Sequence, residues 1–341
     1  MEIMETIEGV EAVEAGIGFT LDQLEKLLKE NPVSYLVEGL LPADDVHVAV
    51  GDSGLGKTPW AYQLGLCVAA GMPFLGHAVR PSRVLYYDLE NGSEEILQVS
   101  RALCGHLGIP SFPKDFFVIP NDGSVPEIEK AVADRRPDLV IVDTLRALHP
   151  EAEMDNSRMA AFLERLRATA RTQHCTILLL HHIRKPGELG MPKLEDTETL
   201  EWLLQAAGAR SLINQTNTRI AFDKRKGDQR EDVSLVMKSF VKLKGESGTL
   251  YLERAHDLQG EPIGYRRLCG VGLLGNPEQE AAFEKLPPTP FRFKEAKQIY
   301  NKADDPTKKW LDKCIAAGLI RKVSRGLYER TEGHGGPRAV E

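Results

Sequence analysis

The order of apolar and polar residues along the chain indicates one large domain of alternating strands and helices. Short runs rich in apolar and β-branched residues at 46–50, 84–87, 116–119, 139–142 and 176–180 alternate with helical patterns at 59–70, 94–107, 126–134 and 157–172. Apolar strands that are each followed by a helix are typical of a parallel sheet covered on both faces. The pattern therefore predicts an α/β domain with a mostly parallel sheet over residues 31–260.

The segments that flank this pattern have a different character. Residues 1–19 hold five glutamates and no basic residue, which predicts a mobile acidic tail, and Thr20 then caps an amphipathic helix at 21–29. From residue 219 the runs at 219–223, 233–243 and 249–253 are separated by polar turns, which predicts β-hairpins. Residues 260–275 are rich in glycine and predict a linker.

Residues 277–331 have the pattern of a separate small domain. Helical periodicity at 278–286, 294–301 and 307–317 precedes two strand-like runs at 320–323 and 327–330. Three helices closed by a two-stranded hairpin is the plan of a winged-helix domain. Four basic residues of the third helix and the hairpin fit contact with duplex DNA: Lys308, Lys309, Lys313 and Arg325. Winged helices also serve as protein–protein adaptors, which is the alternative for this unit.

Composition adds two constraints to this picture. The chain of 341 residues is long enough for two domains, and its net charge of -7 gives no overall indication of nucleic-acid or membrane binding. The five cysteines are scattered and never spaced as C-x-x-C, so neither a disulfide framework nor a zinc site is indicated. The acidic start does not resemble a signal peptide, and no apolar stretch is long enough to span a bilayer. We therefore expect a cytoplasmic protein without a membrane partner.

The strongest chemical signal follows the first run of the sheet pattern. The segment Gly51-Asp52-Ser53-Gly54-Leu55-Gly56-Lys57-Thr58 fits G-x-x-x-x-G-K-[ST], in which backbone N–H groups surround phosphates. Lys57 supplies positive charge to the β- and γ-phosphate oxygens, and the Thr58 hydroxyl is a ligand for Mg²⁺. Pro59 is tolerated in the first turn of the following helix. We expect ATP and Mg²⁺ to bind through Gly51, Ser53, Gly54, Leu55, Gly56, Lys57, Thr58 and Pro59.

Two other predicted strands end in carboxylates. Leu139-Val140-Ile141-Val142-Asp143 is an apolar strand ending in an acid, the Walker B arrangement, so Asp143 is expected to hold the hydrated magnesium ion. The strand at 84–87 leads into Asp88-Leu89-Glu90, and a carboxylate at this point can polarise the water that attacks the γ-phosphate. We assign that role to Glu90. Catalysis by Asp88, or a purely capping role for Glu90, is the alternative.

A pair of histidines ends the last strand of the parallel pattern. Ile177-Leu178-Leu179-Leu180-His181-His182 delivers both imidazoles to the edge of the sheet that carries the other candidate residues. A polar side chain there can sense the γ-phosphate and relay its loss to the following loop. A structural role or half of a metal site is the alternative, although no cluster of acids and cysteines accompanies the pair.

Together these motifs resemble the RepA branch of the RecA-like ATPases, which are plasmid and phage hexameric helicases related to DnaB. The resemblance covers about residues 32–253 and rests on Glu38-Gly39-Leu40-Leu41-Pro42, the phosphate loop, Tyr87-Asp88-Leu89-Glu90-Asn91, Asp143, His181-His182 and the segment from Gly208-Ala209-Arg210. It implies a RecA-like core in which Glu90 activates water and His182 is the sensor. It also implies that Arg219 reaches the neighbouring subunit's site, a role for which Lys242 and Lys244 compete.

The same resemblance implies a homo-oligomer, a hexameric ring, with single-stranded DNA passing through it. The loops that would line the channel are nevertheless acidic, and only Arg184 and Lys185 suit phosphate contacts there. The leading hypothesis is an ATP-driven DNA motor of the RepA helicase type. The alternative is an ATP-dependent DNA-binding or regulatory ATPase that does not unwind DNA. A small-molecule kinase is disfavoured because the chain lacks the Arg-rich lid of such enzymes.

Overall fold

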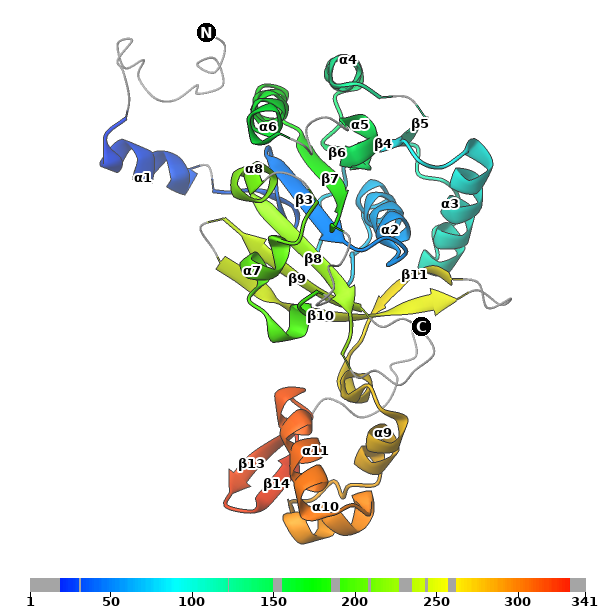
Figure 1. Cartoon of the computed structure of the whole chain (residues 1–341), viewed down its shortest axis with the longest axis vertical. Helices are drawn as coiled ribbons and strands as arrows, with labels where there is room; N and C mark the ends of the chain where they lie inside the picture. Colours follow the sequence, from blue (N-terminus) through cyan, green and yellow to red (C-terminus); the bar gives the residue numbers. More distant parts are fainter. Residues whose placement is uncertain are drawn as a thin grey trace.

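A nine-stranded sheet forms the centre of the computed structural model, which describes residues 19–30, 32–121, 123–149, 155–184, 191–207, 210–226, 235–242, 245–256 and 262–331 (Figure 1). The strand order is β11-β10-β9-β8-β3-β7-β6-β4-β5. The strands are β3 (Val46–Gly51), β4 (Val84–Asp88), β5 (Phe116–Pro120), β6 (Leu139–Asp143), β7 (Thr176–His182), β8 (Thr218–Lys224), β9 (Leu235–Val241), β10 (Gly245–His256) and β11 (Pro262–Arg267). In this spatial order, every pair between β8 and β5 (β8-β3-β7-β6-β4-β5) is parallel. Every pair between β8 and β11 (β8-β9-β10-β11) is antiparallel. The predicted α/β fold with a mostly parallel sheet is confirmed.

Helices cover both faces of the parallel part, as the continuously apolar strands require. On one face, α2 (Lys57–Ala70) and α3 (Ser93–Leu107) pack on Leu178 and Leu180 of β7 and on their neighbours. On the other face, Ile177 and Leu179 belong to a second core together with α4 (Val125–Arg135), α5 (Leu145–Leu148), α6 (Asn156–Thr172), α7 (Thr199–Leu203) and α8 (Arg210–Gln215). Successive residues of β7 thus point to opposite faces and both sets are buried.

The expected linker at 260–275 is the main error of the sequence-based prediction. Residues 262–267 form β11, which pairs antiparallel with β10, and residues 270–274 form the 3₁₀ helix η3 (Gly270–Leu274). Ile263 and Tyr265 are buried under α2 and α3, where Gly264 permits a close approach to Leu103 and Gln63. The glycines therefore allow close packing of a strand, and the sheet extends beyond residue 260 to include it.

The N-terminal helix α1 (Leu21–Glu30) is confirmed, and it begins with mutual hydrogen bonds between Thr20 and Gln23. None of its residues is buried. A two-stranded hairpin, β1 (Tyr35–Val37) and β2 (Leu41–Pro42), connects it to the sheet. The predicted acidic tail lies outside the described residues. Within the described part of the chain, no helix combines the length and apolar character needed to cross a bilayer.

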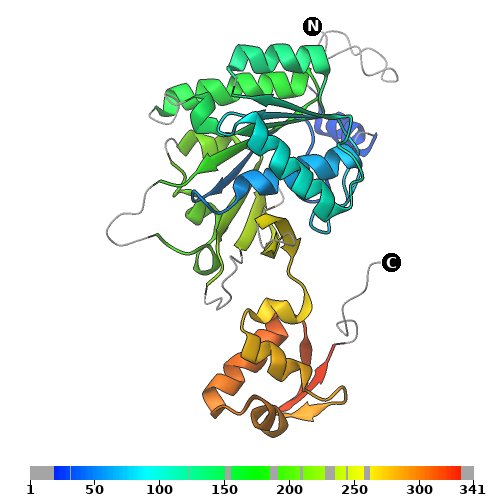
Figure 2. The ribbon, with the colours of Figure 1, turned by 90° about the vertical axis from the view of Figure 1, so that its right-hand side faces the viewer.

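The C-terminal unit has its own core and lies beyond η3, apart from the sheet (Figure 2). Its elements are α9 (Pro277–Glu284), β12 (Phe291–Arg292), α10 (Phe293–Tyr300), α11 (Asp304–Ala316), β13 (Ile320–Ser324) and β14 (Leu327–Arg330). The expected three helices and hairpin are present, and β12 adds a third strand in the order β12-β14-β13. Trp310 and Phe291 are fully buried at the centre of this unit, so it packs around an apolar core separate from that of the sheet.

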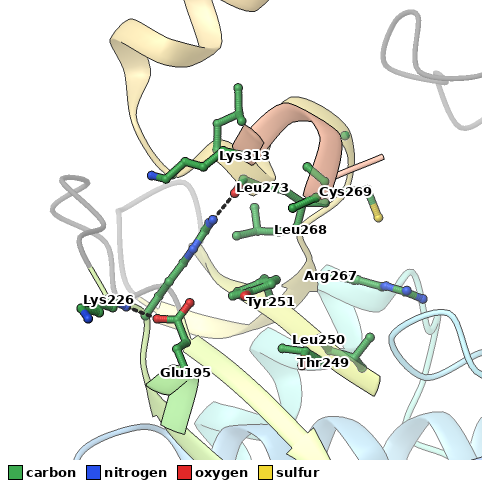
Figure 3. A pocket seen from close by; sticks show the side chains of 16 residues that line it. Glu195, Lys226, Thr249, Leu250, Tyr251, Arg267, Leu268, Cys269, Leu273 and Lys313 are labelled. Atoms are coloured by element: carbon green, nitrogen blue, oxygen red, sulfur yellow. Dashed lines mark hydrogen bonds between the residues drawn. The ribbon is translucent and has the colours of Figure 1, made fainter. Parts of the chain in front are cut away.

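A cavity of 620 Å³ lies where the chain leaves the sheet and enters the C-terminal unit (Figure 3). Arg225 crosses this junction: its guanidinium donates to the carbonyls of Gly272, at 3.2 Å, and Leu273, and lies 4.6 Å from the ring centroid of Tyr251. Lys313 of α11 lines the same cavity. Arg225 therefore ties η3 to the antiparallel half of the sheet.

Candidate active site

The carboxyl ends of the parallel strands bring the separate sequence motifs together. β3 ends at Gly51, and the register places Gly51 opposite His182 of β7. On the neighbouring strands, Asp88 of β4 lies opposite Asp143 of β6. Ligand sites in open parallel sheets form at this edge, because the loops that follow the strands converge there.

The phosphate loop between β3 and α2 adopts a conformation that requires its glycines. Gly54 and Gly56 have φ values of 76° and 84°, in the left-handed region that favours glycine. Gly51 lies against Phe222 of β8, where an added Cβ would come within 3.0 Å of the Phe222 Cβ. Lys57 begins α2, and Pro59 lies in its first turn. The N–H groups at the start of α2 thus adjoin the loop and suit an anionic ligand.

Lys57 is the central cation of the site. Its Nζ donates to the carbonyls of Gly51 at 2.9 Å and Asp52 at 2.8 Å, and lies 3.2 Å from Nδ1 of His182. Burial lowers the pKa of Lys57 to about 8, and nearby Asp143, Asp52 and Glu90 act in the opposite direction. Burial, reinforced by the Lys57 charge, lowers the pKa of His182 to about 4. Near neutral pH, His182 is therefore an uncharged acceptor for the Lys57 ammonium.

Asp143 and Thr58 fit the expected magnesium ion. Tyr86 donates to Oδ2 of Asp143 at 2.9 Å, whereas Oδ1 is buried and lacks a partner of good geometry among the described residues. Burial raises the pKa of Asp143 to about 6, and the neighbouring Thr58 and Tyr86 hydroxyls act in the opposite direction. A buried carboxylate oxygen without a partner suits a cation. Asp143 and Thr58 would hold Mg²⁺, which would supply positive charge against the negative charge that develops on the phosphate oxygens.

Among the described residues, no group of three His, Cys, Asp or Glu side chains is arranged for a metal ion. The alternative of a histidine metal site therefore has no support in the described part of the chain. Nε2 of His181 lies 2.8 Å from the carbonyl of Ala207, so this ring is engaged by the segment before α8.

Glu90 and Asp88 lie in contrasting environments. The Glu90 side chain is 45 % exposed, and its Oε1 accepts a 2.9 Å hydrogen bond from Thr144 and lies 4.0 Å from Nε2 of His182. Asp88 is fully buried and accepts hydrogen bonds from Tyr62 at 2.7 Å and from the Glu90 and Asn91 backbones. Asp88 thus organises the loop that carries Glu90, and the geometry favours Glu90 as the base that meets water.

Several residues of the site gave no signal in the sequence. Thr144 follows Asp143 directly, and only its hydrogen bond to Glu90 reveals its role in positioning that carboxylate. Tyr62 and Tyr86 stack with ring centroids 4.1 Å apart. The Tyr62 hydroxyl donates a hydrogen bond to Asp88, and the Tyr86 hydroxyl donates one to Asp143. In the sequence, both tyrosines look like ordinary core residues of a helix and a strand.

Arg219 and Lys242, two of the predicted inter-subunit residues, lie away from this edge. Arg219 of β8 pairs with Val48 of β3, three residues before Gly51, where β3 ends. Arg219 is 6 % exposed. Its guanidinium donates to the carbonyls of Ile213 and Asn214 at the end of α8. It also lines a surface pocket with Leu200 and Leu204. Lys242 is exposed after β9, and Lys244 lies outside the described residues. A role of Arg219 in a neighbouring site remains a prediction and requires its bonds to α8 to break.

The predicted DNA contacts lie in two places, just after β7 and in the C-terminal unit, and only the second lies apart from the sheet. Arg184 is exposed just after β7, and Lys185 lies outside the described residues. Lys308, Lys309 and Lys313 are exposed on α11, and Arg325 is exposed in the turn between β13 and β14. Since Lys313 lines the junction cavity, Lys308, Lys309 and Arg325 are the cations that lie clear of it.

The fold and the edge of the sheet define a P-loop ATPase. Residues 20–188 match the model of a family described as AAA domain. The matched segment runs from α1 to just beyond β7 and contains the phosphate loop, Glu90, Asp143 and His182. The match supports an AAA-type, P-loop ATPase fold and, with it, nucleotide binding. Arg219, the antiparallel strands and the C-terminal unit lie outside the match.

Replacing Glu90 with glutamine should lower the rate of ATP hydrolysis by about 100-fold or more, because an amide cannot accept a proton from water. Nucleotide affinity should stay close to that of the parent, since Lys57 and Asp143 are untouched. Phosphate release and equilibrium nucleotide binding measure the two quantities. Glu94→Gln, on an exposed position of α3, is the matched control. Turnover within a few-fold of the parent would transfer the role to another group.

Proposed function

We propose that this protein is an ATP-driven motor that forms a ring and acts on DNA, of the RepA helicase type. The observation that carries the proposal is the position of His182, between the Lys57 ammonium and the Glu90 carboxylate at the end of β7. The segment that continues from β7 begins with exposed Arg184. His182 therefore links the phosphate site directly to a segment suited to contact DNA.

In the proposed reaction, the chain supplies charge and orientation. Lys57 and the N–H groups of the phosphate loop hold the phosphates, and Glu90 takes a proton from the attacking water. Loss of the γ-phosphate changes the surroundings of Lys57, and thus of the His182 ring 3.2 Å from its Nζ. The uncharged state of His182 suits this role because the ring can change hydrogen-bond partners without losing an ion pair.

For the C-terminal unit we propose a winged helix that binds duplex DNA. The order α9, β12, α10, α11, β13, β14 supports this proposal, because it is the plan of that domain. Lys308 and Lys309 are exposed on α11 while Trp310 and Leu311 of the same helix are buried. The cations thus point away from the core of the unit and are accessible to phosphates.

Exposed apolar side chains support self-association. Leu21 and Leu28 of α1 are 83 % and 56 % exposed, and Leu200 of α7 and Leu204 directly after it are also exposed beside Arg219. Apolar patches of this kind favour contact with another protein surface. A contact between copies at α7 would also bring Arg219 to a subunit boundary. Arg219 must lie there if it acts as an arginine finger in trans, that is, in the phosphate site of the neighbouring subunit.

The acidic channel segments favour a second candidate, an ATP-dependent DNA-binding or regulatory ATPase without unwinding activity. Residues 150–154 lie outside the described part of the chain, but their sequence adds two glutamates and no base. Phosphate contacts normally come from Lys and Arg, so this segment does not support a threaded strand.

Hydrolysis measured with and without single-stranded DNA, together with the mass in solution, tests the proposal. A motor should be oligomeric with ATP, hydrolyse it several-fold faster on single strands and separate a forked duplex. Binding to duplex DNA without stimulation or strand separation would support the regulatory ATPase instead.

Removing Lys308, Lys309 and Arg325 together by alanine substitution should weaken duplex binding while leaving hydrolysis without DNA unchanged. Three lost phosphate contacts should reduce the slope of log affinity against log salt by up to about 3. A salt titration of duplex binding measures this slope. The matched control is the triple variant Lys285→Ala, Lys294→Ala, Lys302→Ala, on exposed positions of the same unit. An unchanged slope in the first variant would indicate a protein adaptor.

Mixing variants tests whether Arg219 acts in trans. Arg219→Ala and Lys57→Ala should each hydrolyse ATP poorly, and their mixture should recover part of the activity, because some interfaces join an intact loop to an intact finger. Steady-state hydrolysis across mixing ratios is the measurement. Lys57→Ala mixed with Glu90→Gln is the control and should show no recovery, since every phosphate site then carries one defect. A structural role for Arg219 predicts lower thermal stability and no recovery.

A further inference from the structure

The phosphate loop is held from outside by the hairpin β10–β11. The Tyr265 hydroxyl donates to the carbonyl of Leu55, and Nη2 of Arg254 donates to the carbonyl of Gly54 at 2.9 Å. Arg254 and Tyr265 are direct partners across the two strands. Residues about 200 positions after the loop thus contact two successive carbonyls at its tip.

The hairpin is fixed relative to the loop by α2. Gln63 of α2 donates from Nε2 to the Tyr265 carbonyl at 2.9 Å and accepts from the Tyr265 N–H at 2.8 Å. Both bonds are buried. Because α2 begins at Lys57, the helix that follows the loop and the hairpin that contacts it form one unit. The Tyr265 hydroxyl is therefore presented from a rigid backbone.

By holding the Gly54 and Leu55 carbonyls, these contacts also fix the direction of the N–H groups in the same peptides. In a trans peptide, the carbonyl and the following N–H point in opposite directions. The Gly54 carbonyl shares its peptide with the Leu55 N–H, and the Leu55 carbonyl shares its peptide with the Gly56 N–H. Donors that hold both carbonyls toward the hairpin turn both N–H groups away from it. N–H groups of this loop are the ones expected to surround phosphates.

Gly56 and Tyr265 are fitted to each other. A Cβ added to Gly56 would lie 2.1 Å from the Tyr265 oxygen and 3.3 Å from Nη2 of Arg254. Tyr265 itself is 2 % exposed, so its hydroxyl occupies space that any side chain at position 56 would need. Burial raises the pKa of Tyr265, which keeps the phenol protonated and able to donate.

We propose that Arg254 and Tyr265 are positioning residues for the phosphate loop, which set the direction of the Leu55 and Gly56 N–H groups before the nucleotide binds. This inference rests on nucleotide binding at Gly51–Thr58. Neither residue needs to touch the nucleotide. Their contribution is to hold the loop in its binding conformation, so that binding of the phosphates requires less ordering of the backbone.

The test separates nucleotide affinity from turnover. Tyr265→Phe removes one hydroxyl, and Arg254→Ala removes the other donor. Each should raise the Kd of ADP and the KM of ATP by roughly 3- to 10-fold with kcat within about 2-fold, because an interaction common to ground and transition states is lost. Arg254→Lys keeps a donor and should restore part of the affinity. Arg266→Ala, on an exposed position of β11, and Tyr328→Phe, in the C-terminal unit, are the matched controls.

The outcomes distinguish this inference from the nucleotide site itself. Normal ADP affinity in both Tyr265→Phe and Arg254→Ala would overturn the positioning role, even where thermal unfolding showed lower stability. Weakened affinity with the melting temperature of the free protein unchanged would support it. If the parent bound no ADP, or if Lys57→Ala bound it equally well, the phosphate site would be wrong and the positioning role would fall with it.

Discussion

A buried ammonium group is the constraint around which the candidate site is built. Lys57 lies inside its own loop, so its charge must be satisfied by carbonyls and by nearby acids. The loop that surrounds it has left-handed glycines at 54 and 56, and Gly56 also leaves room for Tyr265. The loop thus encloses the cation on one side and contacts the β10–β11 hairpin on the other.

Three carboxylates at this edge differ because their surroundings differ. Asp88 receives hydrogen bonds from a tyrosine and two backbone groups, which fixes a loop. Asp143 is buried with an oxygen left over for a cation, and Glu90 alone is substantially exposed. The strand register brings Asp88 and Asp143 side by side, so the tyrosines beneath them are needed to stabilise two acids at short range. Hydrogen bonding and exposure therefore suit Asp88 to a structural role, Asp143 to the expected cation and Glu90 to the proposed base.

Much of this arrangement could be predicted from local patterns, and the remainder depends on contacts between distant segments. Apolar runs located the five strands from β3 to β7, and the phosphate loop was recognisable from its glycines and Lys57. The β11 strand was missed because its glycine suggested a linker, whereas Gly264 is there to pack against Gln63 and Leu103. Nothing local to Arg219 indicated that α8 carbonyls would bind it. The role of Arg254 and Tyr265 is visible only from their contacts with the phosphate loop. No sequence motif relates these two residues to that loop.

The antiparallel end of the sheet gives the ATPase domain and the C-terminal unit a common element. One part of the β10–β11 hairpin contacts the phosphate loop through Arg254 and Tyr265. β11 then runs into η3, whose carbonyls are held by Arg225 over Tyr251 of β10. Because Arg225 directly follows β8, this junction joins η3 to the end of β8 as well as to β10. The hairpin that leads into the C-terminal unit therefore also contacts the phosphate loop, two residues before Lys57.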